Sequence, residues 1–460
     1  MALNLNVSPP SDPSQRPSTA VPGPARPPAS PPGGPGSSRS LLYAGVAVGA
    51  LVAIVLVAGL WRAFRSEPNR EQAPLPTPTM AVAPASGPVA GVSDTEVVFG
   101  MSSPFSGATK ELGRGMRTGL EVAFAVASES GGVHGRKLRL MALDDGYEPE
   151  RTRQVMRELL DQRKVFAIVG NVGSPTAAVS IPLVMAKKVV FFGALSGAPI
   201  LRKSPPDRYV FNYRPSYAEE TAAAVRYLVD VRRVEPRQIG VFYQDDAFGE
   251  AGLAGVEEQL RRYRRNPAEM VRATYQRNSA DVSEAVARFR KEQGKVKAVV
   301  MVATYQAAIQ FIQQAKDRGL GLVFTNVSAV DANELADALT GAGPGYTSEV
   351  VVTQIVPLPT SKATAALRYQ AALEKHAIGE KPGFLTFEGY IVGNILIEAL
   401  RRAGKELDNE RLVGAFESIQ GVDLGIGTPI TFGPADHQGS HKVWGTQLQP
   451  DGTWKAIDLE

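Results

Sequence analysis

Several residue types on which enzymes and metal sites depend are scarce in this chain. It has no cysteine and only 4 histidines among 460 residues. The lack of cysteine excludes disulfides and thiolate metal sites, and it leaves the redox compartment undetermined. His437 and His441 lie close together but have no glutamate between them, so they do not form a zinc-protease motif. Because a nucleophile elbow and a P-loop are also missing, we predict no enzyme, no cofactor and no metal site.

A large excess of charge of one sign is missing too. The 50 Lys and Arg residues nearly balance the 46 Asp and Glu residues, which gives a net charge of +4. One arginine-rich run, RRYRR at 261–265, stands beside Glu257 and Glu258. This pattern is typical of a solvated helix surface, and contact with acidic lipid or a partner is the alternative. The interspersed charges favour a solvated surface, so we expect no nucleic-acid partner.

The first 95 residues divide by composition into three segments. Residues 1–40 hold eleven prolines and no aromatic residue, which predicts a disordered tail. Residues 41–60 carry no charge and are followed by Trp61 and Arg62. This length matches a hydrocarbon core of about 30 Å, so we predict a transmembrane helix over 41–63. A cleaved signal peptide is the alternative, but forty polar residues ahead of the apolar run disfavour it. Residues 64–95 read as a flexible linker.

From Glu96 onward, short apolar runs alternate with amphipathic segments. The apolar spacing of residues 116–127 predicts a helix with one buried face, ended by Gly131 and Gly132. With the runs on either side it forms a β-α-β unit, which favours a parallel sheet. Pro-Asp-Gly at 450–452 predicts a C-terminal hairpin of residues 443–449 with 453–457. The other predicted strands are 97–101, 138–143, 165–170, 189–192, 239–243, 298–302, 322–325 and 349–355, with helices between them such as 151–161, 218–231 and 280–292.

Six loop motifs occur in order along this part of the chain. They are PFSG at 104–107, GGVHGRK at 131–137, DDGYEP at 144–149, VGNVGSPT at 169–176, GALSGAP at 193–199 and YQDDAFGEAG at 243–252. In this set and spacing, the chain resembles periplasmic solute-binding proteins of the leucine/isoleucine/valine type, which serve branched-chain amino-acid ABC importers. The resemblance covers residue 96 to the C-terminus.

The resemblance implies an α/β fold of two lobes, the type I clamshell of periplasmic binding proteins. Mostly parallel sheets flanked by helices would follow the one transmembrane helix. Residues 96–214 and 352–432 would form lobe 1, and residues 215–351 and 433–460 would form lobe 2. The chain would then cross between the lobes three times and create a hinge.

Ligands of open α/β sheets bind beyond the carboxyl ends of the strands, and the resemblance assigns roles to loops at those ends. Ser174 matches the serine that holds a ligand carboxylate. Leu195, Ser196 and Gly197 match a loop that supplies backbone groups and a hydroxyl. Phe248 matches an aromatic residue that covers the ligand, and Tyr305 falls near another. From the residues alone, a helix cap is the alternative role for Ser174, and a core position is the alternative for Phe248.

Two positions depart from the family pattern. Ser328 occupies the place of an acidic residue that pairs with the ligand ammonium, and Leu112 stands where a tyrosine precedes Gly113. A buried ammonium without a partner charge is unfavourable, so an ordinary α-amino acid is not the favoured ligand. Asp246 or Asp331 could substitute for the missing acid. Amino acids, amides and carboxylates all remain open as ligand classes.

The resemblance implies a membrane-tethered extracytoplasmic protein that captures a small polar organic ligand for an ABC permease. A ligand-sensing receptor that signals to a membrane partner is the alternative, because a permanent tether suits sensing as well. Arg26 and Arg39 precede the apolar segment and three arginines follow it by residue 70, which by itself slightly favours a cytoplasmic C-terminal part. We follow the resemblance and predict a single-pass inner-membrane protein with a periplasmic globular part.

Overall fold

The computed structural model describes residues 89–460. The tail, the apolar segment at 41–63 and the linker up to residue 88 lie outside the described residues. Among residues 89–460, no helix combines the length and the apolar character that a membrane crossing requires.

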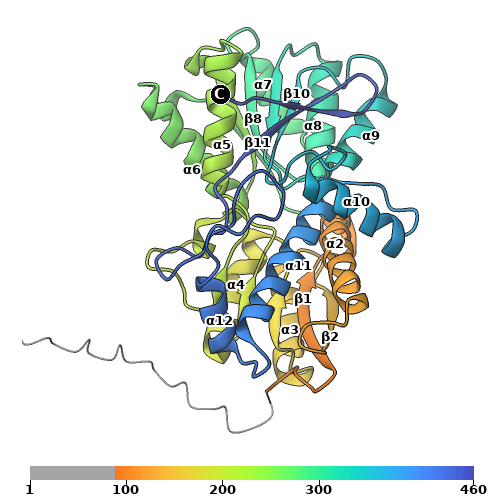
Figure 1. The fold of residues 1–460 in the computed structure, drawn as a ribbon. Helices are drawn as coiled ribbons and strands as arrows, with labels where there is room; N and C mark the ends of the chain where they lie inside the picture. Colours follow the sequence, from red (N-terminus) through yellow and green to blue (C-terminus); the bar gives the residue numbers. More distant parts are fainter. Residues whose placement is uncertain (1–88) are drawn as a thin grey trace, which may run out of the picture. The chain divides into compact units, whose positions relative to one another are not determined.

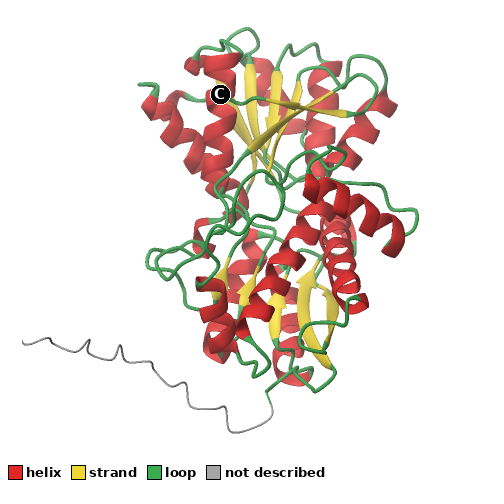
Figure 2. Cartoon of the chain, viewed as in Figure 1, coloured by secondary structure: helices red, strands yellow, loops and turns green. Residues whose placement is uncertain are grey.

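One half of this part contains a five-stranded, entirely parallel sheet in the order β2-β1-β3-β4-β5 (Figures 1 and 2). We call this half lobe 1. Helices α2 and α11 run side by side along it, and α10 and α12 pack on them. Its strands are β1 (Glu96–Ser103), β2 (Lys137–Asp144), β3 (Ala167–Val169), β4 (Phe191–Phe192) and β5 (Val210–Phe211), and its helices are α2 (Lys110–Glu129), α3 (Pro149–Arg157), α4 (Ser174–Lys187), α10 (Thr364–His376), α11 (Phe384–Ala403) and α12 (Asn409–Glu417).

The other half, lobe 2, contains a seven-stranded sheet in the order β12-β11-β10-β9-β8-β6-β7. All neighbouring pairs are parallel except that β11 is antiparallel to both β10 and β12. Its strands are β6 (Ile239–Gln244), β7 (Arg272–Tyr275), β8 (Ala298–Val302), β9 (Val323–Asn326), β10 (Val350–Gln354), β11 (Trp444–Leu448) and β12 (Trp454–Ile457), and its helices are α5 (Tyr217–Arg226), α6 (Ala247–Arg262), α7 (Ser283–Lys291), α8 (Tyr305–Asp317) and α9 (Ala332–Ala342).

The prediction of mostly parallel sheets flanked by helices is confirmed, including the C-terminal hairpin. Two strands were not predicted. β5 is only two residues long, and β7 has polar residues, the half-buried Arg272 and the exposed Thr274, at alternate positions, so neither forms an apolar run. Central strands such as β6 and β8 are buried throughout, as expected for parallel strands covered on both faces.

The chain passes between the two sheets three times, after β5, after β10 and before β11. At the first and third passages the two segments run together, because Asn212 pairs with Gln438 as a parallel bridge. The last residues assigned to the linker, 89–95, pack onto lobe 1 instead. Val92 bridges to Val97, and Gly91 O accepts from Val98 N at 2.8 Å, so the folded part begins before residue 96.

Helices α2 and α11 approach so closely that only glycine fits at their contact. A Cβ at Gly119 would lie 2.0 Å from Thr386 O, and one at Gly389 would lie 2.4 Å from Met116 O. Both obstacles are backbone atoms, which cannot rotate away. The two lobe 1 helices are therefore held together by backbone contact, and α11 places its first turns at the carboxyl edge of the sheet.

We predict that Gly119→Ala lowers the free energy of unfolding by about 1–3 kcal/mol, because the added methyl overpacks the contact between α2 and α11. Gly414→Ala is the matched control, since Gly414 lies in α12 with nothing within 4 Å of its built Cβ. There the same change should stabilise the helix by up to about 1 kcal/mol. Urea unfolding of the full chain in detergent measures both. Equal effects of the two substitutions would contradict the packing argument.

Candidate functional site

Loops at the carboxyl ends of strands from both lobes meet in the structure. We call this region the interlobe junction; it comprises Gln244, Tyr147 and the seven apolar residues named at the end of this paragraph. Gln244, at the end of β6, donates from Nε2 to the hydroxyl of Tyr147, which follows β2, at 3.3 Å. Apolar side chains from both lobes form one buried cluster there, and those of the junction are Leu112, Val172, Leu195, Tyr217, Phe248, Tyr305 and Leu385.

A polar contact closes one side of the interlobe junction. Arg277 Nη2 of lobe 2 lies 3.2 Å from Glu148 Oε2 of lobe 1. Asn278 Nδ2 donates to Glu148 Oε1 at 2.7 Å and to Gly146 O at 3.1 Å. These bonds join two loops that belong to different lobes, so they exist only when the lobes are apposed.

The predicted residues Ser174 and Ser196 are brought together. Their hydroxyl oxygens lie 2.8 Å apart, and both residues are buried. Gly173, not Ser174, is the N-cap of α4, and no side chain caps that helix. The reading of Ser174 as a capping side chain is therefore wrong. Gly173 has φ of 105°, and a Cβ there would lie 2.1 Å from the ring of Tyr147.

Gly197 and Phe248 lie against one aromatic side chain, Tyr217, and Leu195 belongs to the same buried cluster. A Cβ at Gly197 would lie 2.4 Å from Tyr217 N. The Tyr217 and Phe248 ring centroids are 5.0 Å apart. Phe248 is 2% exposed, so it is a core residue, as the alternative prediction stated. The core that it joins contains residues of both lobes.

The predicted residues Leu112 and Gly113 lie in the first turn of α2 and have different roles. Leu112 joins the buried interlobe cluster. Gly113, by contrast, is required by packing, because a Cβ there would lie 1.9 Å from Pro104 O. Tyr305 of lobe 2 is buried and burial raises the pKa of its hydroxyl to about 12, while the nearby backbone of Glu111 opposes the rise; α8, which Tyr305 begins, also contacts the turn just before α2. Tyr305 thus links lobe 2 to the start of α2.

Ser328 lies in a buried network of charges that was not predicted. Its backbone N and its Oγ both donate to Glu220, at 2.8 and 3.0 Å, and its Oγ accepts from Arg214 Nη2 at 2.9 Å. Arg214 also pairs with Glu388 of α11 through Nε at 3.0 Å and Nη2 at 3.2 Å. Thr353 completes the network by donating to Glu220 at 2.7 Å.

This geometry can be compared with known proteins. The sequence profile of a family described as "Periplasmic binding protein" matches residues 96–453. The chain belongs to the periplasmic binding protein family. A possible leucine/isoleucine/valine-binding protein from Rhodopirellula baltica SH 1 is 37% identical in sequence, over 81% of this chain and 98% of that one, with a TM-score of 0.75.

Two further relatives of this periplasmic binding protein are more distant. An "Amino acid binding protein" of Pseudomonas aeruginosa is 24% identical over 56% of this chain and 67% of its own length. A branched-chain amino acid ABC transporter protein from Thermus thermophilus, solved with bound valine, is 18% identical, covers 80% of this chain and 96% of its own, and has a TM-score of 0.69. The last likeness shows the shared fold alone.

The two acids considered as substitutes at the Ser328 position in this periplasmic binding protein have other partners. Asp246 caps α6 by accepting from Phe248 N at 2.9 Å, and it also accepts from Gln244 at 2.7 Å and Arg277 at 3.2 Å. Asp331 caps α9 by accepting from the backbone N of Asn333 and Glu334. The acid beside Ser328 is Glu220, which arrives from α5.

Burial controls the proton affinity of these acids. It raises the pKa of Glu220 and of Glu388, and the nearby Arg214 opposes the rise in both. Burial likewise raises the pKa of Asp331 to about 6, although the α9 backbone donors act in the opposite direction. Glu219, next to Glu220, behaves differently: its hydrogen bonds to His441, Ser216 and Gln438 outweigh burial and lower its pKa to about 2.

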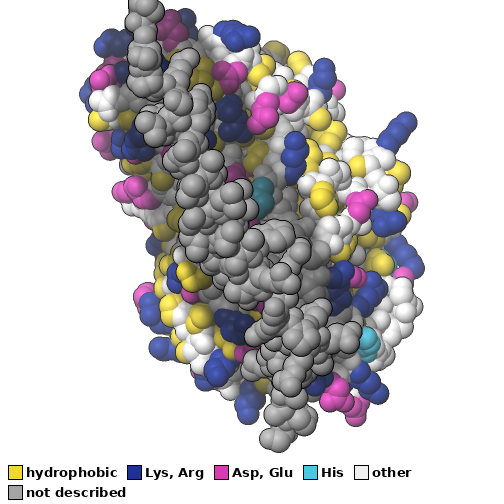
Figure 3. Space-filling model, turned by 60° about the vertical axis from the view of Figure 1, so that its left-hand side comes forward, with side chains coloured by type: hydrophobic (Ala, Val, Ile, Leu, Met, Phe, Trp, Pro, Cys, Tyr) yellow, Lys and Arg dark blue, Asp and Glu magenta, His cyan; other side chains and the backbone are white. Residues whose placement is uncertain are grey.

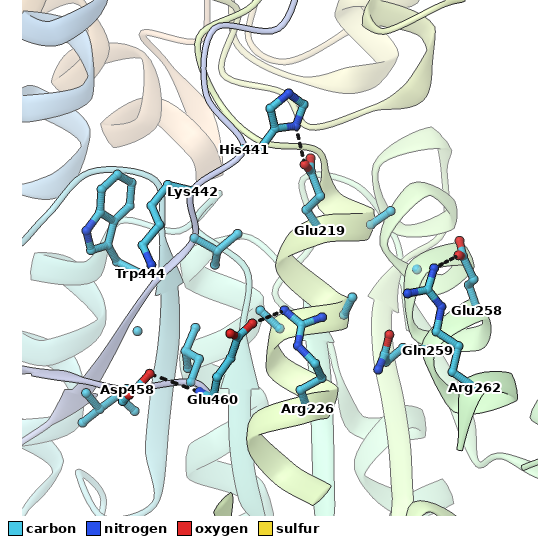
Figure 4. Close-up of a pocket in the computed structure, with 18 of the residues that line it drawn as sticks. Glu219, Arg226, Glu258, Gln259, Arg262, His441, Lys442, Trp444, Asp458 and Glu460 are labelled. Atoms are coloured by element: carbon cyan, nitrogen blue, oxygen red, sulfur yellow. Dashed lines mark hydrogen bonds and ion pairs between the residues drawn. The ribbon is translucent and has the colours of Figure 1, made fainter. Parts of the chain in front are cut away.

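A groove of about 440 Å³ lies elsewhere, between α5, α6 and the C-terminal segment (Figure 4). Its charged side chains largely pair with one another, as Arg226 does with Glu460 at 2.9 Å and Arg262 with Glu258 at 2.6 Å. None of the predicted ligand residues lines it. We therefore place the candidate site at the interlobe junction and not in this groove.

The first two arginines of the run 261–265 lie at the end of α6 and form a solvated helix surface, as predicted, whereas the remaining residues follow the helix. Arg261 and Arg262 are 59% and 66% exposed and pair with Glu257 and Glu258 one turn earlier. In the view of Figure 3, basic and acidic side chains are intermixed over the visible surface.

We predict that Asp331→Asn flattens the pH dependence of stability between pH about 4 and 6. The folded pKa of about 6 lies above the ordinary value of 3.8, so the native state binds the proton more tightly and stability falls as pH rises through this window. Asparagine still caps α9 but cannot ionise. Above pH 6 the free energy of unfolding of the variant should therefore exceed that of wild type by on the order of 1–3 kcal/mol. Urea unfolding from pH 4 to 8 measures the difference, and a constant difference across that range would refute the assignment.

Proposed function

We propose that this chain captures a small organic ligand between its two lobes and presents the closed form to an ABC importer. One observation carries the proposal: side chains from the carboxyl ends of both sheets form a single buried junction while the chain links the lobes through three passages. Ligands of α/β sheets bind at this edge of the strands. Belonging to the periplasmic binding protein family supports the same role.

Hinge rotation explains how such a junction admits a ligand. Separating the lobes breaks the bonds of Glu148 with Arg277 and Asn278 and the bond of Gln244 with Tyr147. It also exposes the apolar cluster to water, which is unfavourable. A ligand that contacts both lobes adds interactions to the closed form alone, so it shifts the equilibrium toward closure. The importer then needs only to recognise the closed surface.

The lining indicates the general nature of the ligand. Leu112, Leu195, Tyr217 and Phe248 offer apolar contact, and the paired hydroxyls of Ser174 and Ser196 offer hydrogen bonds. Small-molecule sites commonly combine an apolar wall with a few polar groups in this way. An amino acid, an amide or a carboxylate with an apolar body suits these contacts. Residues 41–63 would anchor the protein in the inner membrane, with residues 89–460 in the periplasm.

A screen for thermal stabilisation tests the proposal. We predict that at least one amino acid, amide or carboxylate from a broad panel raises the Tm of the full-length protein in detergent. Binding to the native state alone stabilises by about 2.7 kcal/mol at a ligand concentration of 100 times Kd, which is several degrees of Tm. A panel without any stabilising compound would reject the role of solute capture.

We also predict that Ser174→Ala weakens binding of the best compound about three- to tenfold, the loss expected for one neutral hydrogen bond. Ser180→Ala is the matched control, because Ser180 is equally buried in α4 but donates to Thr176 O within the helix. Titration calorimetry with both variants measures the difference. If Ser174→Ala binds as tightly as Ser180→Ala, Ser174 does not contact the ligand.

A further inference from the structure

Arg214 has one nitrogen with no partner, although the residue is completely enclosed. The side chain is 1% exposed, and its Nε and Nη2 are occupied by Glu388 and Ser328. Its Nη1 is buried and has no hydrogen-bond partner. Leaving a buried donor of a charged group unpaired is unfavourable by more than an ordinary hydrogen bond. Such an atom in the middle of an otherwise complete network indicates a place for an acceptor.

The partners of the other two guanidinium nitrogens, Nε and Nη2, show where Nη1 lies. Glu388 belongs to α11 of lobe 1, whereas Ser328 follows β9 of lobe 2. The guanidinium therefore spans the two lobes, and because it is planar and rigid, Nη1 lies beside Nη2 at the same boundary. Leu385, one turn before Glu388 on α11, belongs to the apolar cluster of the interlobe junction. The unpaired donor thus belongs to a guanidinium that is held one helical turn from the apolar lining.

Two other unpaired polar atoms lie on the lobe 1 side of this boundary. Ser103 Oγ, at the end of β1, and Thr109 Oγ1, just before α2, are buried without partners. A Cβ at Gly113 would lie 3.2 Å from Ser103 Oγ, which places that hydroxyl beneath the first turn of α2. Leu112 of the same turn is in the apolar cluster. Unpaired hydroxyls therefore flank the lining as well.

The acids near Arg214 are already engaged. Glu388 accepts from Arg214 with both oxygens, and Glu220 accepts from Ser328 and Thr353. Asp246 and Asp331 serve as helix caps. An ammonium group would meet the positive guanidinium at the one nitrogen that is unpaired, so that group is disfavoured there. An oxygen acceptor meets two N–H bonds.

We propose that Arg214 contacts the ligand through Nη1 and selects small organic molecules with an apolar body and a carbonyl or carboxylate oxygen, without an α-ammonium group. This inference rests on the proposed function, because it assumes that the interlobe junction binds the ligand. It makes Arg214 a specificity residue in addition to its role in joining the lobes. Amides and carboxylates share the required oxygen, and the experiment below separates them.

Four probes that share an isobutyl group test this selection on the full-length wild-type protein. They are isovaleramide, isovalerate, leucine and isoamylamine, each compared by thermal shift and calorimetry. We expect isovaleramide or isovalerate to bind about tenfold or more tightly than leucine, and isoamylamine not to bind. Which of the first two binds better decides between a neutral and an anionic oxygen. The inference fails if leucine or isoamylamine binds best, or if none of the four binds.

Arg214→Lys keeps the charge but removes the planar fork, so it should weaken the better probe about ten- to a hundredfold. Arg208→Lys is the matched control, because Arg208 pairs with Glu410 while it is 53% exposed. Equal binding by wild type and Arg214→Lys would overturn the proposal. Should Arg214→Lys fail to fold, a crystal structure of wild type with the better probe decides instead. An oxygen about 2.7–3.2 Å from Nη1 supports the proposal, and a larger separation refutes it.

The two proposals fail in different ways. If leucine binds best, solute capture stands and the role of Arg214 falls. If none of the four probes binds and the broad panel also contains no stabilising compound, the proposed solute capture is rejected as well.

Discussion

A charged group remains inside a protein only where its partners are fixed, and the Arg214 guanidinium meets this condition at the boundary of the two lobes. Glu388 from lobe 1 and Ser328 from lobe 2 hold it, and Glu220 and Thr353 hold Ser328 in turn. Removing any one of these leaves a buried charge or donor without its partner, which is strongly unfavourable. The register of the lobes at the base of the junction therefore depends on this network, and the positions of the apolar lining follow from it.

The close contact of α2 with α11 has a related effect. Glycine at 119 and 389 lets the two helix backbones touch, so the first turns of both helices reach the carboxyl edge of the lobe 1 sheet. Leu112 comes from one of these turns and Leu385 from the other, and both enter the cluster that lobe 2 completes. The lining of the candidate site is thus built from two segments more than 260 residues apart in sequence. Solute capture requires such a composite surface, because a site confined to one lobe would gain nothing from closure.

Much of this arrangement could be predicted from the sequence, and the exceptions have physical causes. Long apolar strands such as β8 and the Pro-Asp-Gly hairpin carry their signals locally. The loop motifs around Ser174 and Ser196 placed both residues at the same edge of the sheet, and in the structure their hydroxyl groups are within hydrogen-bond distance. β5 and β7 lack an apolar run, and the charge network has no local signal at all. Arg214 follows a short strand, and Glu220 stands beside the capping residue Glu219 on α5, so nothing in the sequence distinguishes either from a surface charge. Only the fold reveals that residues 214, 220, 328 and 388 converge.

The C-terminal hairpin determines when the sheet of lobe 2 can be completed during synthesis. β11 and β12 continue the lobe 2 sheet beyond β10, although residues 355–443 separate them from it. Until residues 444–457 have left the ribosome, β10 offers an unpaired edge to any other strand nearby. Lobe 1 also contains α10–α12, which emerge shortly before. Neither lobe can acquire all its strands and helices until synthesis is nearly complete. During synthesis the nascent chain therefore has an unpaired edge strand, which can pair incorrectly. A chaperone that shields this border would act in the interval before the last strands arrive.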